Sequence, residues 1–333
     1  MGESASVSNK LTEFGLVCDA GSSNAGLYGL TDLFKYAGEF AAKRRRAGEM
    51  PAVRVTHWQI DDGDVEPRCT YDTRPGVQRS PAVLVLPGNV VAPEADANPS
   101  LIAWLRRKHS EGAVVAAVCG GVFILAETGL LEGRQATTHW SFADRFAERF
   151  PTVLTETDKM VVDYGDVVTA GGVLAWADLG LRLTERFLGS PVMIETARYM
   201  NVDPPWREQR FYSEFVPRTK HGDGAILKAQ QWLSSKREHS ITVADAARHV
   251  ALEPRTFLRR FVKATGMKPT EYQQRLRMSR ARELLEFSRT SVDVVAARVD
   301  YDDVTAFRRV FRKIVGLNPS EYRRRFVAQS PPP

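Results

Sequence analysis

The stretch Phe257-Leu258-Arg259-Arg260-Phe261 recurs as Phe307-Arg308-Arg309-Val310-Phe311, fifty residues further along the chain. The residues after it repeat at the same offset: Gly266, Pro269, Glu271-Tyr272 and Arg275 are matched by Gly316, Pro319, Glu321-Tyr322 and Arg325. The residues before it follow, with Ala246-Ala247-Arg248 matched by Ala296-Ala297-Arg298. A repeat of this length, with helical spacing in each copy, predicts two related supersecondary units side by side.

Each copy predicts a short helix, a tight turn and a second helix. The short helices are expected over Val243–Val250 and Val292–Val299, and the second copy continues with a helix over Thr305–Val315. In the first copy Phe257 and Phe261 lie one turn apart and are expected to be buried. This is the helix-turn-helix arrangement, whose second helix enters the major groove of DNA.

The side chains on the outward face of the two second helices are mostly basic. In the first copy they are Arg255, Leu258, Arg259 and Lys263, and in the second Thr305, Arg308, Arg309 and Arg312. Residues 220–333 hold 23 Lys and Arg against 12 Asp and Glu, although the whole chain carries a net charge of only +6. Such a basic segment suits a phosphate-bearing partner, because neutralised phosphates release counterions. A solvated charged surface is the alternative.

A long helix is predicted between the two copies, from about Thr270 to Phe287. It would hold the two second helices apart, so that they could enter successive major-groove segments about 34 Å apart. The second copy ends in Asn318-Pro319-Ser320-Glu321, which has the spacing of a capping box.

The N-terminal part alternates short apolar runs with longer amphipathic ones. Strands are expected over Phe14–Cys18, Val53–Ile60, Ala82–Leu86, Ala113–Cys119 and Val167–Ala170, and helices over Thr31–Lys43, Ser100–Ser110, Val122–Thr128, Ser141–Phe150 and Ala175–Leu188. This alternation predicts an α/β domain with a largely parallel, flavodoxin-like sheet. Its ligands should bind at the carboxyl ends of the strands.

One strand end has the pattern of a nucleophile elbow. Cys119 lies between an apolar strand and a helix and is followed by Gly120-Gly121. A helix N-terminus can lower the pKa of a thiol, so Cys119 is placed to be reactive. His139 follows twenty residues later and could act as its base or hydrogen-bond partner. A buried thiol that only packs is the alternative.

The stretch Val118–Leu131, followed by Gly133–Trp140, resembles the PfpI-type, class-I glutamine-amidotransferase-like domain found in GlxA-type regulators. The resemblance covers residues 11–190. It implies that the cysteine and the histidine form the reactive pair and that the Pro87-Gly88-Asn89 loop contributes to an oxyanion pocket. The implied ligand-binding residues are Gly88, Asn89, Cys119, Gly120 and His139.

The chain departs from that family where its enzymes place an acidic residue after the first strand. The corresponding position falls near Gly26, and residues 21–30 contain no Asp or Glu. Asp19 is too close to the strand end to replace it. We therefore expect a binding pocket instead of an active site, with Cys119 and His139 as vestigial catalytic residues.

Residues 225–327 resemble the AraC/XylS-type DNA-binding domain. The resemblance rests on Pro254–Phe261, Gly266–Tyr272, Arg277, Ala281-Arg282, Leu284-Leu285 and Phe307–Tyr322. It implies that bases are read by Arg255, Leu258, Arg259, Thr305 and Arg309. Leu258 departs from the usual polar residue and could contact only an apolar group such as a thymine methyl. Arg255 and Arg259 favour guanine, with a phosphate contact as the alternative. Arg260, Arg312, Lys313 and Arg323-Arg324-Arg325 are expected to face phosphates or solvent.

The cysteine content and the lengths of the apolar runs limit the expected location of the protein in the cell. Cys18, Cys69 and Cys119 cannot form a closed disulfide set and lack zinc-ligand spacing. We expect a reduced cytoplasmic location at the nucleoid, with no membrane segment, no metal and no cofactor.

These observations predict three segments: a sensing and dimerisation domain over 8–190, a linker over 191–222 and a DNA-binding domain over 223–329. We expect a homodimeric, sequence-specific regulator of transcription that binds double-stranded promoter DNA, responds to a small polar metabolite and contacts RNA polymerase. The resemblance favours an activator, although the sequence leaves the sign of regulation, the effector and the operator open. A cysteine-dependent hydrolase or amidotransferase, and an architectural DNA-binding protein, are the alternatives.

Overall fold

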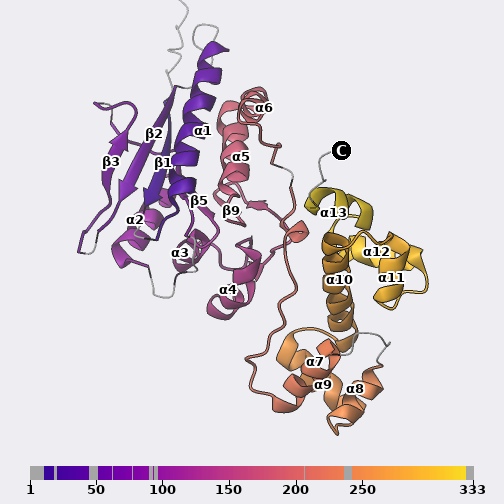
Figure 1. Cartoon of the computed structure of the whole chain (residues 1–333). Coiled ribbons are helices and arrows are strands. Elements are labelled where there is room, and N and C mark those ends of the chain that lie inside the picture. Colours follow the sequence, from indigo (N-terminus) through magenta and orange to yellow (C-terminus); the bar gives the residue numbers. More distant parts are fainter. Residues whose placement is uncertain are drawn as a thin grey trace, which may run out of the picture. The chain divides into compact units, whose positions relative to one another are not determined.

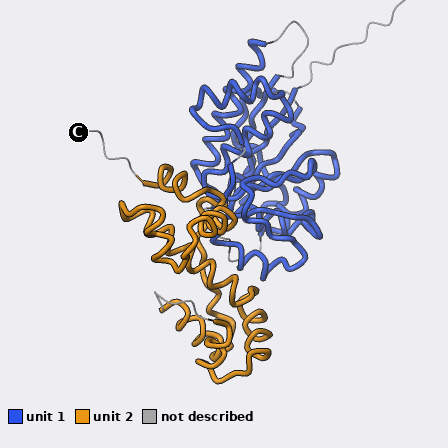
Figure 2. The backbone as a smooth tube through the Cα atoms, turned by 90° about the vertical axis from the view of Figure 1, so that its right-hand side faces the viewer, with its two compact units in different colours: residues 1–209 blue, residues 210–333 orange. Residues whose placement is uncertain are grey.

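In the computed structural model the chain forms two compact units, Met1–Gln209 and Arg210–Pro333 (Figure 2). The structure describes residues 11–18, 21–44, 52–61, 63–76, 78–89, 93, 97–205, 207–235 and 242–327. Asp19, residues 8–10 and residues 328–329 lie outside the described residues. The boundary between the units falls inside the stretch 191–222 that was expected to be a linker.

The N-terminal unit is built on a seven-stranded sheet of order β3-β2-β1-β4-β5-β9-β8 (Figure 1). Strands β2, β1, β4, β5 and β9 are parallel, and β3 and β8 pair antiparallel at the edges. The bounds are β1 Thr12–Cys18, β2 Val53–Gln59, β3 Arg68–Asp72, β4 Val83–Leu86, β5 Val114–Val118, β8 Val161–Asp163 and β9 Val167–Ala170, with β6 Gln135–Ala136 and β7 Leu154–Thr155 in a separate two-stranded sheet. The strand order reverses between β1 and β4, which is where ligands bind in such sheets. The predicted α/β fold is confirmed.

Helices cover both faces of this sheet, as the contacts of Phe14 and Val17 in β1 show. Phe14 stacks on Phe34 of α1 with ring centroids 4.0 Å apart and meets Phe187 of α5 edge-on. Val17, three residues later, belongs to the core that Trp104 of α2 also joins. Residues separated by an odd number lie on opposite faces of a strand. The two helical layers therefore cover opposite faces.

The helices of this unit are close to those predicted, with two differences. Their bounds are α1 Asn24–Lys43, α2 Pro99–Ser110, α3 Gly121–Glu127, α4 Ala143–Arg149, α5 Trp176–Leu188 and α6 Ser190–Tyr199, with short 3₁₀ helices η1 Trp140–Phe142 and η2 Gln209–Phe211. Helix α1 begins seven residues earlier than the predicted Thr31, because the side chain of Ser23 caps the amide of Gly26. Helix α6 lies in the stretch expected to be a linker, and Val192 of α6 packs in a core with Phe40 of α1.

The C-terminal unit consists of seven helices among its described residues (Figure 1). They are α7 Gly224–Ser235, α8 Val243–His249, α9 Pro254–Thr265, α10 Pro269–Phe287, α11 Val292–Arg298, α12 Val304–Val315 and α13 Pro319–Phe326. Two separate cores form, one around Phe257 and Phe261 and one around Phe307 and Phe311. Helix α10 contributes to both, through Tyr272 and then Met278. The prediction of an all-α domain with two helix-turn-helix units is confirmed.

The two helix-turn-helix units, α8–α9 and α11–α12, are not related by a single offset. Helices α9 and α12 begin fifty residues apart, whereas α8 and α11 begin forty-nine residues apart. The amide of Leu252 donates to the carbonyl of Ala247, and the amide of Tyr301 donates to that of Ala296, both at 3.0 Å. Ala247 thus corresponds to Ala296, so the predicted match of Ala246-Ala247-Arg248 with Ala296-Ala297-Arg298 is wrong by one residue. The second turn contains one residue more than the first.

No helix among the described residues is long and apolar enough to cross a membrane.

Candidate functional site

Cys119 occupies the sharp turn between β5 and α3. Its φ of 53° lies in the left-handed region, which is uncommon for a residue other than glycine and marks a constrained turn. Hydrogen bonds fix both of its backbone polar groups. Its amide donates to the carbonyl of Ala170 at 2.8 Å, and its carbonyl accepts from the Thr138 hydroxyl at 2.7 Å. The elbow predicted from the sequence is therefore present.

The ends of β1, β4 and β5 converge at this turn. Gly88, with φ of 100°, lies so close to β5 that a Cβ there would be 2.9 Å from the carbonyl oxygen of Val118. The amide of Ser23 donates to the carbonyl of Gly88 at 2.7 Å, and Ser22 forms a β-bridge with Asn89. The loops that carry Gly88, Asn89, Cys119 and Gly120 thus meet at the point where the strand order reverses. We call these four residues and His139 the strand-end site.

Burial dominates the chemistry of the Cys119 thiol. The residue is 2% exposed, and desolvation raises its pKa to about 11, although a hydrogen bond from the Gly120 backbone acts in the opposite direction. At neutral pH the side chain is therefore a thiol and not a thiolate. The thiolate is the nucleophilic form of cysteine, so this turn holds Cys119 in its unreactive form.

His139 lies beside the elbow but is directed toward a different partner. Its Nδ1 lies 2.7 Å from the Ser141 hydroxyl and accepts a hydrogen bond from the Ser141 amide at 3.2 Å. Because a backbone amide can only donate, the proton of the neutral ring sits on Nε2. Burial lowers the pKa of His139, which favours that neutral ring. Among the described residues no hydrogen bond joins His139 to the Cys119 thiol.

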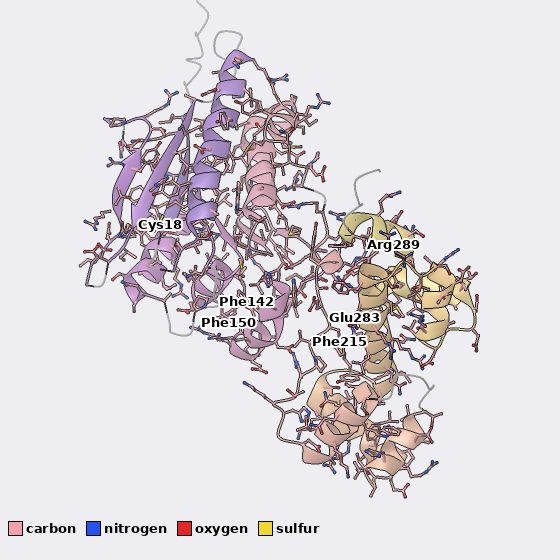
Figure 3. The ribbon with its side chains drawn as sticks, viewed as in Figure 1. Cys18, Phe142, Phe150, Phe215, Glu283 and Arg289 are labelled. Carbon is pink, nitrogen blue, oxygen red and sulfur yellow. The ribbon has the colours of Figure 1, made fainter. Side chains whose placement is uncertain are left out.

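Aromatic side chains support the His139 segment from one side. The His139 ring lies 5.3 Å from the ring of Phe142, which meets Phe123 of α3 edge-on. Phe150, at the end of α4, approaches the same Phe123 ring (Figure 3). The histidine is thus carried on a segment that packs against α3.

Gly26, near which the acidic residue of the resembled family was expected to fall, has no room for a side chain. A Cβ there would be 2.4 Å from the carbonyl oxygen of Pro87, well inside van der Waals contact. Helix α1 and the loop after β4 therefore approach each other closely above the strand ends.

Two residues that hold the strand-end site together were not found from the sequence. The hydroxyl of Thr138 reaches the Cys119 carbonyl, and the amide of Gln209 reaches the carbonyl of Thr138 at 3.0 Å. Thr138 precedes the histidine and could have been suspected for that reason. Gln209 lies about seventy residues away in sequence, inside the stretch expected to be a linker, and no local pattern marks it.

On α9, the predicted outward residues are exposed, and the two phenylalanines are fully buried. Arg255, Arg259 and Lys263 have no carboxylate partner among the described residues. Leu258 is 39% exposed and lies on the same outward face. This helix therefore presents three uncompensated cations together with an apolar contact surface.

On α12, Thr305, Arg309 and Arg312 are exposed, and the two arginines likewise have no carboxylate partner in the described part of the chain. Arg308 was expected to be free to face DNA, but its guanidinium lies 3.6 Å from the Asp293 carboxylate on α11. Both side chains of this pair are more than half exposed, so the pair is weak and can be exchanged for another partner.

Two arginines that were expected to face phosphates or solvent, Arg260 and Arg323, bind within the protein instead, whereas Arg325 is exposed and also contacts a hydroxyl of the protein. Arg260 forms two hydrogen bonds with Asp223, at 2.8 and 2.6 Å. Arg323 donates to the carbonyl of Thr290 at 2.7 Å, and Arg325 donates to the Tyr212 hydroxyl at 2.8 Å. The expectations for Arg260 and Arg323 were wrong because their acceptors are distant in sequence, so no local pattern reveals them.

No group of three or more His, Cys, Asp or Glu among the described residues could hold a metal ion.

Comparison with known proteins identifies both parts of the chain. Residues 246–325 match the model of a helix-turn-helix domain, and residues 63–186 match that of the DJ-1/PfpI family. The chain is similar to the HTH-type transcriptional regulator ArgR of Pseudomonas aeruginosa, with 29% identity over 70% of this chain and 72% of ArgR. It is also similar to the HTH-type transcriptional regulator GlxA of Rhizobium meliloti, with 27% identity over 66% of this chain and 68% of GlxA.

A shorter part of the chain is also similar to an enzyme. Isonitrile hydratase of Pseudomonas putida is 27% identical over 41% of this chain and 56% of the hydratase. Three relatives whose similarity extends over two thirds of this chain are HTH-type transcriptional regulators. The chain is therefore similar to helix-turn-helix transcriptional regulators, and its two parts match a DJ-1/PfpI-type domain followed by a helix-turn-helix domain.

Proposed function

We propose that this protein regulates transcription by reading promoter DNA with α9 and α12 under the control of a small polar metabolite bound at the strand-end site. We assign sensing and homodimer formation to residues 8–190, the linker role to 191–222 and DNA binding to 223–329. The observation that carries the DNA part is the exposed face of each second helix, where Arg259 and Arg309 stand at equivalent positions and have no carboxylate partner among the residues that the structure describes.

The exposed arginines suit direct reading of bases. A guanidinium can donate two hydrogen bonds to the O6 and N7 atoms of guanine in the major groove. Arg255, Arg259 and Arg309 are assigned this role, and Leu258 is assigned a contact with a thymine methyl. Lys263, Arg308 and Arg312 are assigned to phosphates, which position the protein without reading sequence. Thr305 can contact either a base or a phosphate.

Three properties of the strand-end site support binding over catalysis. Burial keeps Cys119 protonated at neutral pH. In the neutral ring of His139 the proton is on Nε2. That nitrogen therefore donates a hydrogen bond and has no free lone pair with which to act as a base. Finally, Gly26 leaves no space for an acidic residue at that position. A polar ligand could use the imidazole donor and the backbone groups of Gly88 and Gly120, with the Asn89 amide as a further partner.

Selection from random DNA tests the regulatory proposal. The full chain should enrich one asymmetric sequence whose two parts lie about one helical turn apart. In competition at fixed salt, random DNA should then bind at least about a thousandfold more weakly than the selected site. Equal affinity for both would contradict the proposal and favour an architectural DNA-binding protein. A metabolite screen against the selected complex would identify the effector, and size measurements would test the homodimer. Contact with RNA polymerase would be tested on the same promoter fragment.

A cysteine-dependent enzyme is the second candidate, favoured by the elbow geometry at Cys119. Its discriminating property is the pKa of the thiol. In a Cys18→Ser, Cys69→Ser background, alkylation of Cys119 by iodoacetamide should accelerate continuously from pH 7 toward pH 11. A rate that levels off near neutral pH would indicate a stabilised thiolate and support the enzyme. Cys119→Ser should leave DNA binding intact under either proposal, and loss of a measurable turnover in that variant would favour the second.

A further inference from the structure

Gln209 is buried against the segment that carries His139. The residue is 1% exposed, and its side-chain amide both donates and accepts hydrogen bonds. Nε2 donates to the carbonyls of Thr138 and Thr157, both at 3.0 Å, and Oε1 accepts from the amide of Trp140 at 2.9 Å. The two backbone groups it holds at 138 and 140 flank His139. Gln209 therefore fixes the histidine segment from both sides.

The contact between Gln209 and the 137–140 segment leaves little room for movement. The backbone amide of Gln209 donates to the carbonyl of Asp158 at 2.8 Å, so the residue is held through its main chain as well. A Cβ at Gly171, next to the site, would lie 2.3 Å from Nε2 of Gln209 and 2.7 Å from the Thr138 carbonyl oxygen. Only a residue without a side chain fits at position 171. A shift of the 137–140 segment must therefore be accompanied by a shift of Gln209 or by loss of its hydrogen bonds.

The same segment is linked to the elbow. The Thr138 hydroxyl donates to the Cys119 carbonyl, and its own carbonyl accepts from Gln209. A chain of two hydrogen bonds thus connects the backbone of the strand-end site to the last residue of the N-terminal unit.

The residues that follow immediately are held by the second helix-turn-helix unit. Phe211 accepts through its carbonyl from Arg282 of α10 at 2.6 Å, and its ring lies under the guanidinium of Arg325 at 5.4 Å. A Cβ at Gly316, the residue that ends α12, would be 2.5 Å from the Phe211 ring. Tyr212 adds a hydrogen bond from Arg325 at 2.8 Å. Residues 211 and 212 are therefore anchored on α10, the end of α12 and α13.

The first helix-turn-helix unit contacts the chain only later along this connection. Phe215, labelled in Figure 3, meets Tyr272 in the first core edge-on, with ring centroids 5.1 Å apart. The residues closest to Gln209 in sequence are thus bound to the second unit, and those further along are bound to the first.

We propose that Gln209 is a positioning residue that couples the strand-end site to the second helix-turn-helix unit. One residue separates its anchor beside His139 from the anchor of Phe211 on α10, α12 and α13. A ligand that moves the 137–140 segment changes the hydrogen bonds of Gln209, and the change passes through Arg210 to the end of α12. This inference rests on the proposed function, because it assigns how occupation of the strand-end site reaches DNA.

Amide hydrogen exchange of the full chain tests the coupling without ligand or DNA. In Gln209→Ala, exchange should rise in residues 137–140, as a local role alone requires, and also by at least about fivefold in residues 316–326. The matched control is Gln230→Ala, which removes an equally buried amide that bonds to the Arg218 carbonyl at 2.9 Å. It should loosen the first unit and leave 137–140 unchanged. Unchanged exchange over 316–326 in Gln209→Ala would overturn the proposal, as would an equal rise there in Gln230→Ala.

Coupling is reciprocal, so the opposite end supplies a second test. Arg325→Ala removes the contacts to Phe211 and Tyr212 at an exposed site and should raise exchange in 137–140 by a similar factor. Arg324→Ala, at the neighbouring exposed position, is the control and should not. This arm decides the matter if Gln209→Ala fails to fold, and an unchanged 137–140 segment in Arg325→Ala would overturn the coupling. Because DNA is absent, the result is separate from any failure of selective DNA binding.

Discussion

The two helix-turn-helix units have the same fold but differ in the side-chain caps at the starts of their helices. In the first, α9 begins after Glu253 without a side-chain cap, and α10 begins after Lys268 without one. In the second, Asp303 caps α12, and Asn318 forms a full capping box with Glu321 at the start of α13. Side-chain caps satisfy amides that a helix leaves unpaired at its start. The second unit therefore has side-chain caps on α12 and α13 that α9 and α10 of the first unit lack, whereas in the first unit Thr242 and Asp245 form a full capping box at α8.

The first unit relies on contacts that are distant in sequence. Arg260 pairs with Asp223, which precedes α7, and the equivalent position in the second unit is Val310. Helix α7 adds Ile226 and Leu233 to the first core. The comparison shows that duplicated units can reach one fold with different contacts: the first adds α7 and the Asp223–Arg260 pair, and the second adds caps at the starts of α12 and α13.

Truncating a core aromatic residue should produce the largest difference in hydrogen exchange between the two helix-turn-helix units. Phe307→Ala empties a fully buried position in the second core and should cost about 3–5 kcal/mol of unfolding free energy. Because the two cores share no residue, hydrogen exchange should rise over α11–α13 much more than over α8–α9. Phe257→Ala should show the opposite distribution. Equal loosening of both units in either variant would show that they fold as one cooperative body.

Replacing one exposed arginine in each unit should show that they read different bases. Arg259→Ala and Arg309→Ala should each lower affinity for the selected site by about 5- to 150-fold, equivalent to about 1–3 kcal/mol for a bidentate contact with guanine. Each should relax base preference at a separate position, about one helical turn apart, in a repeated selection. Arg312→Ala, assigned to a phosphate, is the control and should weaken all sequences alike. Uniform loss in all three variants would refute base reading by Arg259 and Arg309.

The caps predict a smaller difference that concerns stability alone. Asn318→Ala should lower the unfolding free energy by about 1 kcal/mol, because the hydrogen bond from the Glu321 amide to the Asn318 side chain at the start of α13 is lost. Lys268→Ala changes the equivalent position in the first unit, where no side-chain cap exists, and should have almost no effect. Urea denaturation of both variants measures the contrast. A similar loss in both would mean that the caps do not distinguish the units.

The Asp223–Arg260 pair predicts the smallest effect, and it depends on pH. The hydrogen bonds from Arg260 lower the pKa of Asp223 from 3.8 to about 2. A carboxylate with a lowered pKa in the folded state stabilises the protein above its unfolded pKa, and this stabilisation is lost as the pH falls toward 2. Asp223→Asn should therefore weaken the first unit slightly at pH 7, and the difference from the unchanged protein should disappear by about pH 2. Exchange over α7–α9 as a function of pH measures it. A difference in exchange between the variant and the unchanged protein that stays constant with pH would assign the effect to packing.

The parts of the fold that sequence patterns predicted are those with strong local signals. The five parallel strands are apolar runs, and the helices of the repeat carry regularly spaced phenylalanines, so both were found within a few residues. Strand β3 was missed because it is a half-exposed edge strand, with only its pairing to β2 to define it. Helix α6 was missed because its proline and nearby turn formers are also typical of a linker.

At the strand-end site, too, sequence patterns predicted the local feature but not the contacts that form on folding. The elbow was predicted because a strand, a cysteine and two glycines stand together in the sequence. The pairing of Cys119 with His139 was the natural expectation, yet the histidine bonds to Ser141, two residues away, and desolvation sets the pKa of the thiol. Burial and hydrogen-bond direction are properties of the assembled site, so neighbouring residues in the sequence do not reveal them.

By itself the sequence determined the two-part architecture, the duplicated helix-turn-helix and the elbow, because periodicity, turn residues and caps act within a few residues of one another. Only the tertiary structure decided which of two adjacent arginines is available. Arg259 is exposed, whereas Arg260 is bound to Asp223, thirty-seven residues away. It likewise decided that Gln209 holds the His139 segment. Side chains of identical chemistry acquire different roles because their partners come from remote parts of the chain, which meet only when the cores form.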